Sequence, residues 1–459
     1  MRSPKSVRYA ALVALICSGA LTMPLAPIAT TAAAQEAKWW ERLPGFGTPE
    51  ARRKPASNQK KNEPLDDLRK GPIPLRSDEM LDMIKKAVER YKAIVKNGGW
   101  PKIGVFRHLR PGDDHEAIPS VRRRLIASGD IPQRAASYYR GSFSFDEWLE
   151  QGVKAFQLRH GLRVTGRLDR STRAQLAVTA EARLRQLELN GRRIAALIEG
   201  RIEERYILVN VPAFQLEAVE RFEVKRRHRV IVGKPNRQTP AITATIRGLN
   251  FFPYWHVPDS VSKLDLIPRL QKEPDYLRKE HIRVLKDNFN GQELDAASIN
   301  WKQADYKIIK FRQDPGPWNA LGLVRINMPN KDIVYMHDTP MKPLFKQRSR
   351  AFSAGCVRVQ NVMELASWIA KYEPGFSSPG AVDAIVEKGH TTDPSTGRPK
   401  EFDVNLIRPL PVLFTYITAW AERGGRVEFR PDIYGRDGSS EFAGERDPDD
   451  PPPPMMLSP

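Results

Sequence analysis

The chain has 459 residues, which is enough for two or three domains with a sizeable core. Its formal net charge of +20 points less to nucleic acid than to an acidic surface such as cell-wall polymer or anionic lipid, with plain solubility as the simpler explanation. Two cysteines, one of them in a segment expected to be removed, exclude an internal disulfide in the mature protein.

Residues 1–34 are predicted to be a signal peptide that directs export. The segment has the three parts of such a signal in order: a positive start at Arg2, Lys5 and Arg8, an apolar stretch from Ala10 to Met23, and small residues at Ala32-Ala33-Ala34. The apolar stretch is too short for a comfortable membrane span, so the mature protein is expected outside the cytoplasm with a charge of about +17. Retention of the segment as an uncleaved anchor is the open alternative.

Residues 35–76 are predicted to form a disordered basic linker, because prolines and clustered positive charges outnumber apolar residues there. Residues 77–113 follow as a helical scaffold segment. Apolar residues recur at intervals of three and four from Met80 to Val95, Ser77 stands where a helix cap belongs, and Gly98-Gly99 end the pattern.

Residues 114–182 are predicted to be a small all-α domain, whose last short helix is capped by Ser171 or Thr172. Its motifs are Ala155-Phe156-Gln157, His160-Gly161-Leu162, Thr165-Gly166 and Ser171-Thr172. With these motifs, about sixty residues resemble the peptidoglycan-binding helical domain of many wall enzymes. A helical bundle without a ligand is the alternative, since a fold alone does not establish a function.

From residue 203 to 437 short apolar runs alternate with turn residues, a pattern that predicts a β-rich domain with an antiparallel sheet. The region from about 258 to 298 is polar and helix-like, and we expect it to be a helical insert that acts as a lid. Residues 438–459 are acidic and rich in proline and should be a disordered tail. The predicted fold class is therefore α+β.

Chemistry is indicated by Cys356, which follows His337 by nineteen residues. An unperturbed thiol has a pKa near ~8.5 and needs a base to become a nucleophile, so His337 is the predicted general base for Cys356. A backbone carbonyl such as that of Asp338 is placed to orient the imidazole. Gly355 has no side chain, so the backbone beside Cys356 can offer N–H groups to an oxyanion.

No metal site or cofactor is predicted. The remaining histidines, among them His160, His256 and His390, lack the spacing of metal ligands. Position 354, directly before the Gly-Cys pair, holds alanine. The sequence therefore offers no second imidazole beside the cysteine.

Several motifs now stand in order along the chain: Val232-Gly233-Lys234, Arg237-Gln238-Thr239-Pro240, Pro253-Tyr254-Trp255, Val257-Pro258, Asp314 to Pro317, Asn319 to Gly322, and Ser353-Ala-Gly-Cys-Val-Arg358 after His337. Together they resemble the L,D-transpeptidases of the YkuD type, in the long periplasmic form with a peptidoglycan-binding domain. The resemblance covers most of residues 78–437. Many members of that family have histidine at the position held here by Ala354.

The resemblance implies a ping-pong acyl transfer through a thioester on Cys356, which joins two diaminopimelate residues of peptidoglycan in a 3→3 cross-link. It implies a periplasmic location, reaction with carbapenems, and stem peptides as both donor and acceptor. His337 and Asp338 keep the roles described above, and Gly355 supplies the oxyanion hole. The residues implied to contact substrate are Tyr335, Trp255, Ser353 and Arg358, although Arg358 also fits a role in bracing its loop, and the two aromatics fit a core.

Three alternatives remain at this level. The same thioester can serve to attach outer-membrane proteins to the wall or to exchange terminal D-amino acids. A second class is a wall-binding scaffold without catalysis. A papain-like peptidase requires histidine far downstream of the cysteine, which is the opposite of the order of His337 and Cys356.

Overall fold

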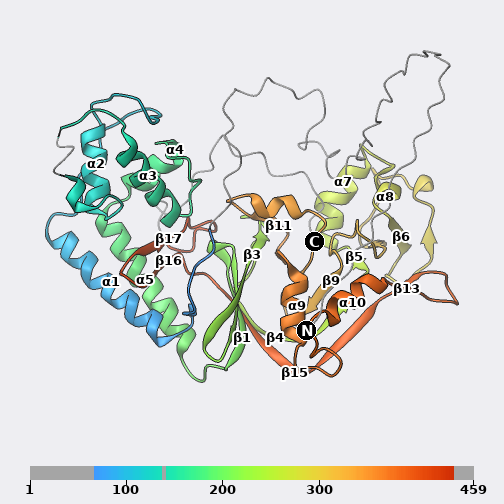
Figure 1. Cartoon of the computed structure of the whole chain (residues 1–459). Coiled ribbons are helices and arrows are strands. Elements are labelled where there is room, and N and C mark those ends of the chain that lie inside the picture. The colour runs from blue at the N-terminus through green and yellow to red at the C-terminus, as the bar shows by residue number, and fades with distance from the viewer. Residues whose placement is uncertain (1–66, 137–140, 439–459) are drawn as a thin grey trace, which may run out of the picture.

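The structure is a computed structural model that describes residues 67–136 and 141–438 (Figure 1). The predicted signal peptide, most of the predicted linker and nearly all of the predicted tail therefore lie outside the described residues. Within the described ranges, no helix has the length and apolar character needed to cross a membrane. A helical part that includes α1 to α5 lies on one side of the β-rich domain, and the insert lies on the other (Figure 1).

The elements have the following bounds. The α-helices are α1 Asp78–Lys96, α2 Ile118–Ala127, α3 Glu147–Arg159, α4 Arg170–Ala177, α5 Ala180–Ile198, α6 Asp259–Val261, α7 Ile267–Leu270, α8 Tyr276–Lys279, α9 Val362–Ala370 and α10 Ala381–Lys388. Other short helical turns are η3 Gln133–Ala136, η4 Val211–Ala213, η5 Ser262–Leu266, η6 Ala296–Ser298 and η7 Lys342–Lys346. The strands are β1 Arg205–Asn210, β2 Gln215–Glu220, β3 Glu223–Gly233, β4 Ile242–Phe251, β5 Trp255–His256, β6 Ile282–Lys286, β7 Glu293–Leu294, β8 Ile309–Gln313, β9 Val324–Asn327, β10 Met336–His337, β11 Ala351–Ser353, β12 Val357–Val359, β13 Thr391–Thr392, β14 Pro399–Lys400, β15 Phe402–Thr415, β16 Ala419–Ala421 and β17 Val427–Phe429.

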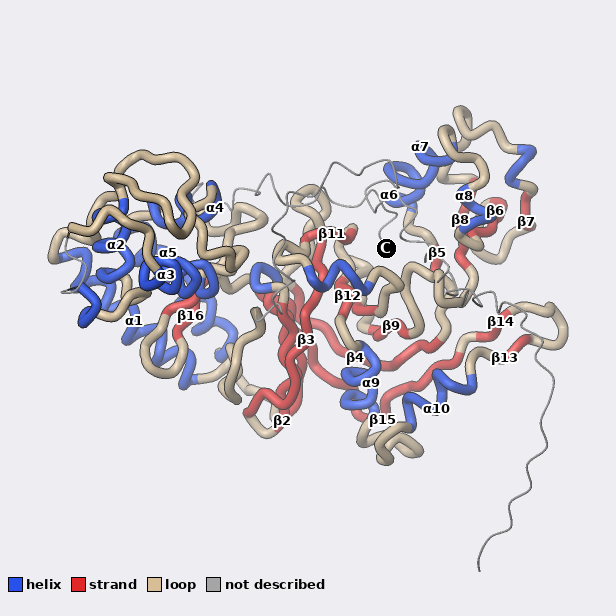
Figure 2. The backbone as a smooth tube through the Cα atoms, turned by 45° about the horizontal axis from the view of Figure 1, so that its top comes forward, coloured by secondary structure: helices blue, strands red, loops and turns tan. Residues whose placement is uncertain are grey.

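The main sheet has the strand order β11-β3-β12-β10-β9-β4-β15-β1-β2 and closes on itself, because β3 also pairs with β2 (Figure 2). The prediction of an antiparallel sheet is wrong in part. The pairs β1–β15, β10–β12 and β11–β3 run parallel. Parallel partners need long crossover connections, and local alternation along a strand does not reveal its partner's direction.

Both faces of the sheet are buried, as β1 shows. Ile207 and Val209 point into the core that α9 covers, whereas Tyr206 and Leu208 point into a second core beneath α1 and α5. Successive side chains of a strand alternate between faces, so a strand buried on both sides reads as one apolar run. Each fully buried aliphatic side chain of this kind is worth about 1.5–3 kcal/mol relative to exposure.

Helix α1 begins where the sequence predicts. Ser77 is the cap residue, and its hydroxyl accepts the N–H of Met80 at 3.2 Å. Gly98 and Gly99 both have positive φ, and the N–H of Gly99 returns to the carbonyl of Ile94 at 2.9 Å. The predicted stop signal is thus confirmed as a glycine turn that satisfies a terminal carbonyl.

The helical domain contains the predicted helices, but the predicted cap is wrong. Asp169 caps α4 by accepting the N–H of Thr172, and Ser171 and Thr172 lie in the first turn of the helix. The side chain of Gln157 forms hydrogen bonds with several of the motif residues. Its side-chain NH₂ group donates to the hydroxyl of Thr172 at 2.9 Å, and its carbonyl oxygen accepts the N–H of Gly166 at 2.9 Å. In this domain the motif polar groups hold the fold together.

This domain packs against the hairpin β16–β17, which also contacts α1 and α5. The guanidinium of Arg430, which follows β17, donates to the backbone carbonyl of Arg159 at 3.2 Å. His160 is stacked between Phe156 and Phe429, at ring-centroid distances of 3.8 and 5.4 Å. The hairpin comes from the C-terminal end of the chain, so these contacts fasten the helical domain to the β-rich domain.

The insert differs from the predicted helical lid in its second half. Its helices α6 to α8 are present, but strands β6 and β7 follow and join β5 and β8 in a four-stranded sheet (Figure 2). Strands β5 and β8 extend the unit beyond 258–298 on both sides. The insert has its own core around Trp255, Leu270 and Phe311. Strands β6 and β7 have only five and two residues, so the sequence offers little alternation from which to predict them.

The end of the predicted linker is ordered, which corrects the prediction for residues 67–76. Ile73 and Leu75 are buried in the core beneath α1. Asp67 pairs with Arg350 at 2.7 Å, and Arg69 pairs with Glu217 at 2.8 Å. A local excess of prolines and charges could not reveal that these charges find buried partners far along the chain.

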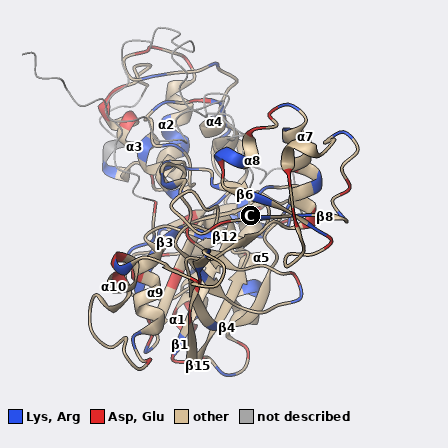
Figure 3. Ribbon diagram, turned by 90° about the vertical axis from the view of Figure 1, so that its right-hand side faces the viewer, with Lys and Arg blue, Asp and Glu red and all other residues tan. Residues whose placement is uncertain are grey.

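Lys and Arg residues occur in the helical part, the sheet and the insert alike (Figure 3). Several arginines are buried and do not contribute to a basic surface. The guanidinium carbon of Arg124 lies 3.8 Å from the ring centroid of Trp100, and that of Arg183 lies 4.4 Å from Phe429. Part of the net charge therefore serves cation–π packing inside the molecule.

Candidate active site

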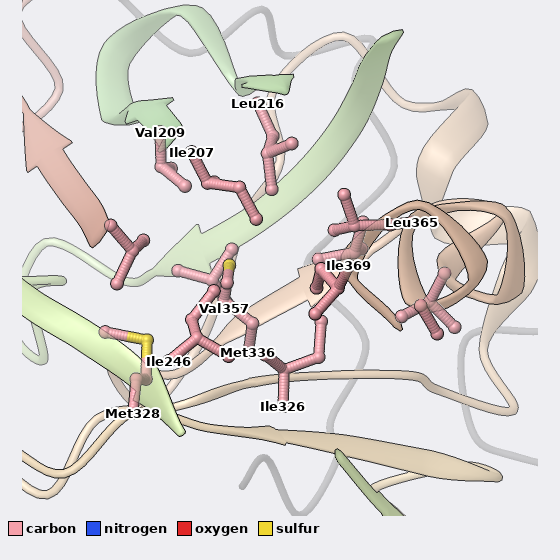
Figure 4. Close-up of a cluster of buried hydrophobic side chains, with 14 of the residues drawn as sticks. Ile207, Val209, Leu216, Ile246, Ile326, Met328, Met336, Val357, Leu365 and Ile369 are labelled. Carbon is pink, nitrogen blue, oxygen red and sulfur yellow. The ribbon is translucent and has the colours of Figure 1, made fainter. Parts of the chain in front are cut away.

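The pairing of β10 with β12 places the predicted catalytic residues on one face of the sheet. Met336 pairs with Val357 in a parallel register, and both point into the apolar core beside α9 (Figure 4). Side chains alternate along a strand, so the residues before and after them point to the opposite face. That face carries four predicted site residues: Tyr335, His337, Cys356 and Arg358.

The His337 ring is fully buried and held at one nitrogen. Nδ1 lies 2.5 Å from the backbone carbonyl oxygen of Asp338, a contact that requires the proton on Nδ1. In the neutral ring Nε2 then carries the free lone pair, and Nε2 has no hydrogen-bond partner among the described residues. Burial, together with the charge of Arg358, holds the pKa of His337 well below its usual value. The imidazole is therefore neutral and available as a base.

The carbonyl that orients His337 belongs to Asp338, whose side chain is held in place because both carboxylate oxygens have partners. Oδ2 accepts the N–H of Leu323 at 3.0 Å, and Oδ1 is paired with Lys342. Gly322 has a φ of +63°, and a β-carbon there would lie 2.4 Å from Asp338 Oδ2. The Asn319 to Gly322 motif thus leaves room for the carboxylate that positions Asp338.

Cys356 is the free cysteine of the described residues, and it is 8% exposed. Its thiol receives hydrogen bonds from the backbone and the phenol of Tyr335. Burial raises the pKa of Cys356 to about 11, although Tyr335 and the charge of Arg358 oppose the rise. The resting thiol is therefore protonated at neutral pH and needs a base to react.

The turn before Cys356 is organised by Ser353, which is fully buried. The Ser353 hydroxyl accepts the N–H of Gly355 at 3.2 Å and donates to the carbonyl of Cys356 at 2.6 Å. Gly355 has a φ of +126°, a conformation that favours glycine. The N–H predicted to form the oxyanion hole is thus engaged, whereas no bond from the N–H of Cys356 is found within the described ranges. The hydroxyl of Ser353 is likewise committed to the turn.

Arg358 is 2% exposed, and its Nε has no hydrogen-bond partner in the part of the chain that the structure describes. Burial lowers the pKa of Arg358 to about 10, and the nearby Cys356 opposes this. No carboxylate of the described residues pairs with this guanidinium. A buried cation without an ion pair is costly, and an anionic ligand or a thiolate would offset that cost.

The two aromatic residues predicted to contact substrate both lie at the core of the insert. Trp255 is 1% exposed and belongs to the core of the insert. Tyr335 and Ala354 pack against the edge of that core, which places the insert beside the turn that carries Cys356. Arg237 and Asp265 form a further ion pair between the loop after β3 and the insert.

Two residues that support the site through backbone hydrogen bonds were not among the predicted site residues. The Thr239 hydroxyl donates to the carbonyl of Gly355 at 2.8 Å, and the phenol of Tyr434 donates to the carbonyl of Gly233 at 2.6 Å. Thr239 lies in a motif that the sequence singled out, but Tyr434 has no local signal. No group of three or more His, Cys, Asp or Glu side chains suited to a metal ion occurs in residues 67–136 and 141–438.

Comparison with known families agrees with this fold. Residues 204–387 match the family YkuD, described as the L,D-transpeptidase catalytic domain. Residues 115–176 match the family described as "Putative peptidoglycan binding domain". The chain therefore combines a β-rich part that is similar to L,D-transpeptidase catalytic domains with a helical part that is similar to peptidoglycan-binding domains.

A curated relative from Haemophilus influenzae, named "Putative L,D-transpeptidase", is 35% identical over 232 residues. These residues make up 50% of this chain and 44% of the relative, so the match spans less than half of the relative's length. Among solved structures, an L,D-transpeptidase from Mycobacterium smegmatis is 13% identical with a TM-score of 0.22 and covers 46% of this chain and 58% of that one. One from Stackebrandtia nassauensis is 12% identical with a TM-score of 0.22 and covers 59% and 91%.

Proposed function

We propose that this protein is a peptidoglycan L,D-transpeptidase that forms 3→3 cross-links between diaminopimelate residues in the periplasm. The observation that carries the proposal is the parallel register of β10 and β12. It sets Cys356 and His337 on one face, with Nδ1 of the histidine held by Asp338 and Nε2 unbonded among the described residues. The catalytic domain supports the reaction class, and the helical domain supports peptidoglycan as the polymer.

In the acylation step the Cys356 thiol gives its proton to Nε2 of His337, and the sulfur forms a bond to the carbonyl carbon of diaminopimelate in a tetrapeptide stem. The oxyanion receives a hydrogen bond from the N–H of Cys356, since the N–H of Gly355 is engaged by Ser353. The bond to the terminal D-alanine then breaks, and its amine takes the proton from His337. A thioester remains on Cys356.

In the transfer step the amine of a second stem attacks the thioester. His337 accepts a proton from the attacking nitrogen, and the new amide forms as the bond between carbon and sulfur breaks. The thiolate then recovers the proton from His337. The guanidinium of Arg358 faces the thiolate and can bind a substrate carboxylate during either step.

The first test is covalent labelling with meropenem, a carbapenem that acylates a nucleophilic cysteine. We expect intact-protein mass spectrometry to show one adduct on the wild type and none on Cys356→Ala. Circular dichroism of both proteins should show the same folded spectrum. An unlabelled wild type that is folded would instead favour a wall-binding scaffold without catalysis.

The second test distinguishes the acceptors. Wall digests from cells that express the wild type should contain 3→3 dimers that are absent with Cys356→Ala. If the same digests contain protein-linked stems or exchanged D-amino acids in place of dimers, the thioester chemistry stands and the cross-linking claim is wrong. Cell fractionation of the same strains tests the periplasmic location and removal of the signal peptide.

A further inference from the structure

A C-terminal segment outside the matched catalytic domain is connected by hydrogen bonds to the turn that carries Cys356. This segment, residues 432–437, is here called the C-terminal brace. The catalytic family match ends at residue 387. The brace is fastened to the rest of the molecule through Asp432, which accepts the Tyr416 phenol at 2.6 Å, and through Asp437, which pairs with Arg193 of α5 at 2.6 Å.

The brace contacts the loop 233–239 mainly through one phenol. Tyr434 Oη donates to the carbonyl of Gly233 at 2.6 Å and accepts the N–H of Thr239 at 3.2 Å, so it bridges both ends of the loop. Arg436 adds a bond to Gln238 Oε1 at 2.7 Å. The loop is tight, because a β-carbon on Gly233 would lie 2.1 Å from the carbonyl oxygen of Arg237.

The loop in turn contacts the nucleophile turn at two points. Thr239 Oγ1 accepts the N–H of Gly233 at 2.9 Å and donates to the carbonyl of Gly355 at 2.8 Å. The N–H of Lys234 donates to the carbonyl of Ser353 at 2.9 Å. Hydrogen bonds of ordinary length therefore connect the Tyr434 phenol, through the loop, to the residue before Cys356.

From this chain of contacts, and resting on the proposed function, we propose that Tyr434 is a positioning residue for Cys356. The phenol fixes the loop 233–239, and Thr239 transmits that position to Gly355 and so to the N–H and the sulfur of Cys356. Acyl transfer depends on small displacements of the attacking atom, because a misplacement of about 1 Å can slow a reaction roughly 100-fold. In this role both residues act on Cys356 through Gly355 and not by touching the substrate.

The test compares Tyr434→Phe with Tyr206→Phe, using the rate of meropenem acylation on the full chain. Tyr206 is a matched control, because it is buried and donates its phenol to a backbone carbonyl, that of Arg76, at 3.1 Å on the far face of the sheet. We expect Tyr434→Phe to lower the maximal acylation rate roughly 10- to 100-fold while the half-saturating concentration stays unchanged. Tyr206→Phe should change neither after correction for the folded fraction.

Thr239 supplies a conservative rescue. Thr239→Val removes the hydroxyl that bonds Gly355 and should slow acylation as Tyr434→Phe does, whereas Thr239→Ser keeps the hydroxyl and should restore the rate. The double variant Tyr434→Phe/Thr239→Val should be no slower than the slower single variant, since both changes break one connection. If the double variant is slowed by the full product of the two single effects, the proposal is overturned.

Two further outcomes are decisive. Equal acylation rates in Tyr434→Phe and the wild type overturn the proposal, as does an equal loss in Tyr206→Phe. If meropenem does not label the wild type, the proposed function fails, and hydrogen exchange still tests Tyr434. Faster exchange of the amides of residues 233–239 in Tyr434→Phe, but not in Tyr206→Phe, supports the brace, and unchanged exchange overturns it.

Discussion

The thiol of Cys356 and the imidazole of His337 are both neutral in the resting site, since burial raises the pKa of the first to about 11 and lowers that of the second. A proton must therefore move from sulfur to nitrogen as the carbonyl is attacked. This arrangement differs from a preformed thiolate–imidazolium pair. It keeps the thiol unreactive until a substrate is in place.

The pH dependence of acylation follows from this protonation state. Between pH 7 and 9 the wild-type rate should be nearly flat, because His337 is already neutral and Cys356 is still protonated. In His337→Ala the reaction requires thiolate, so the rate should rise about tenfold per pH unit up to the pKa of about 11. At pH 7 the variant should be roughly 100- to 10,000-fold slower. Meropenem labelling rates across this range measure both slopes, and a flat profile in the variant would identify a different base.

Gly322 provides a test of how Asp338 orients the base. Gly322→Ala places a methyl group against Asp338, which must shift together with the carbonyl that holds His337 Nδ1, so acylation should slow roughly 10- to 100-fold. Gly375→Ala is the matched control, because Gly375 has a φ of +82° and a β-carbon added there would meet nothing within 4 Å. Both variants carry similar backbone strain, and equal slowing in both would contradict the role of the Asp338 contact.

At the scale of elements, the strap of residues 67–76 contributes more than its composition suggests. Burial opposes the ionisation of Asp67, but the charges of Arg350 and Arg229 outweigh it and hold the pKa of Asp67 below its usual value. Arg350 is fully buried and lies three residues before Ser353. The strap therefore neutralises a cation within the segment that leads to the nucleophile turn.

Loss of this ion pair should strongly destabilise the folded state. Asp67→Ala leaves Arg350 buried without its carboxylate, which should cost about 3–5 kcal/mol of the free energy of unfolding. Glu89→Ala removes the exposed partner of Lys92 on α1 and should leave the unfolding midpoint unchanged within error. Denaturant unfolding of the two variants makes the comparison, and a similar midpoint for both would mean that the strap does not hold Arg350.

The elements also show what a sequence can and cannot predict here. Period and capping signals predicted α1 and its cap Ser77, and motif spacing alone related Cys356 to His337. The parallel partners of β1 and β10, the buried ion pair of Asp67 and the phenol of Tyr434 depend on contacts more than 20 residues apart. No local pattern encodes such contacts, because each side chain alone fits a surface as well as an interior.

For the molecule as a whole, buried histidines set the acid limit of stability. Burial, with the charge of a neighbouring arginine, holds the pKa of His160 and of His337 well below the usual value, so the folded state keeps both neutral where the unfolded chain would be protonated. The unfolded state then binds more protons below about pH 6.5, and stability is lost as the pH falls.

Each such histidine should lower the free energy of unfolding by about 2 kcal/mol between pH 7 and pH 5. His160→Phe keeps the stack with Phe156 and Phe429 but cannot be protonated. Its midpoint of thermal unfolding should fall less between pH 7 and pH 5 than that of the wild type. Identical falls would show that His160 takes up a proton in the folded state.

Strand β15 has a consequence for the order in which the molecule can be completed. It begins at residue 402, after every other strand of the main sheet, yet it lies between β4 and β1 and pairs with both. Without β15 the other strands can pair only as an open sheet, which runs from β4 through β3 to β1 and leaves β4 and β1 without the partner that they share. A truncated chain that contains Cys356, His337 and the whole matched region, which ends at residue 387, still lacks the strand that closes this sheet. The sheet that carries the nucleophile is therefore closed only after a segment that follows the matched region has been synthesised.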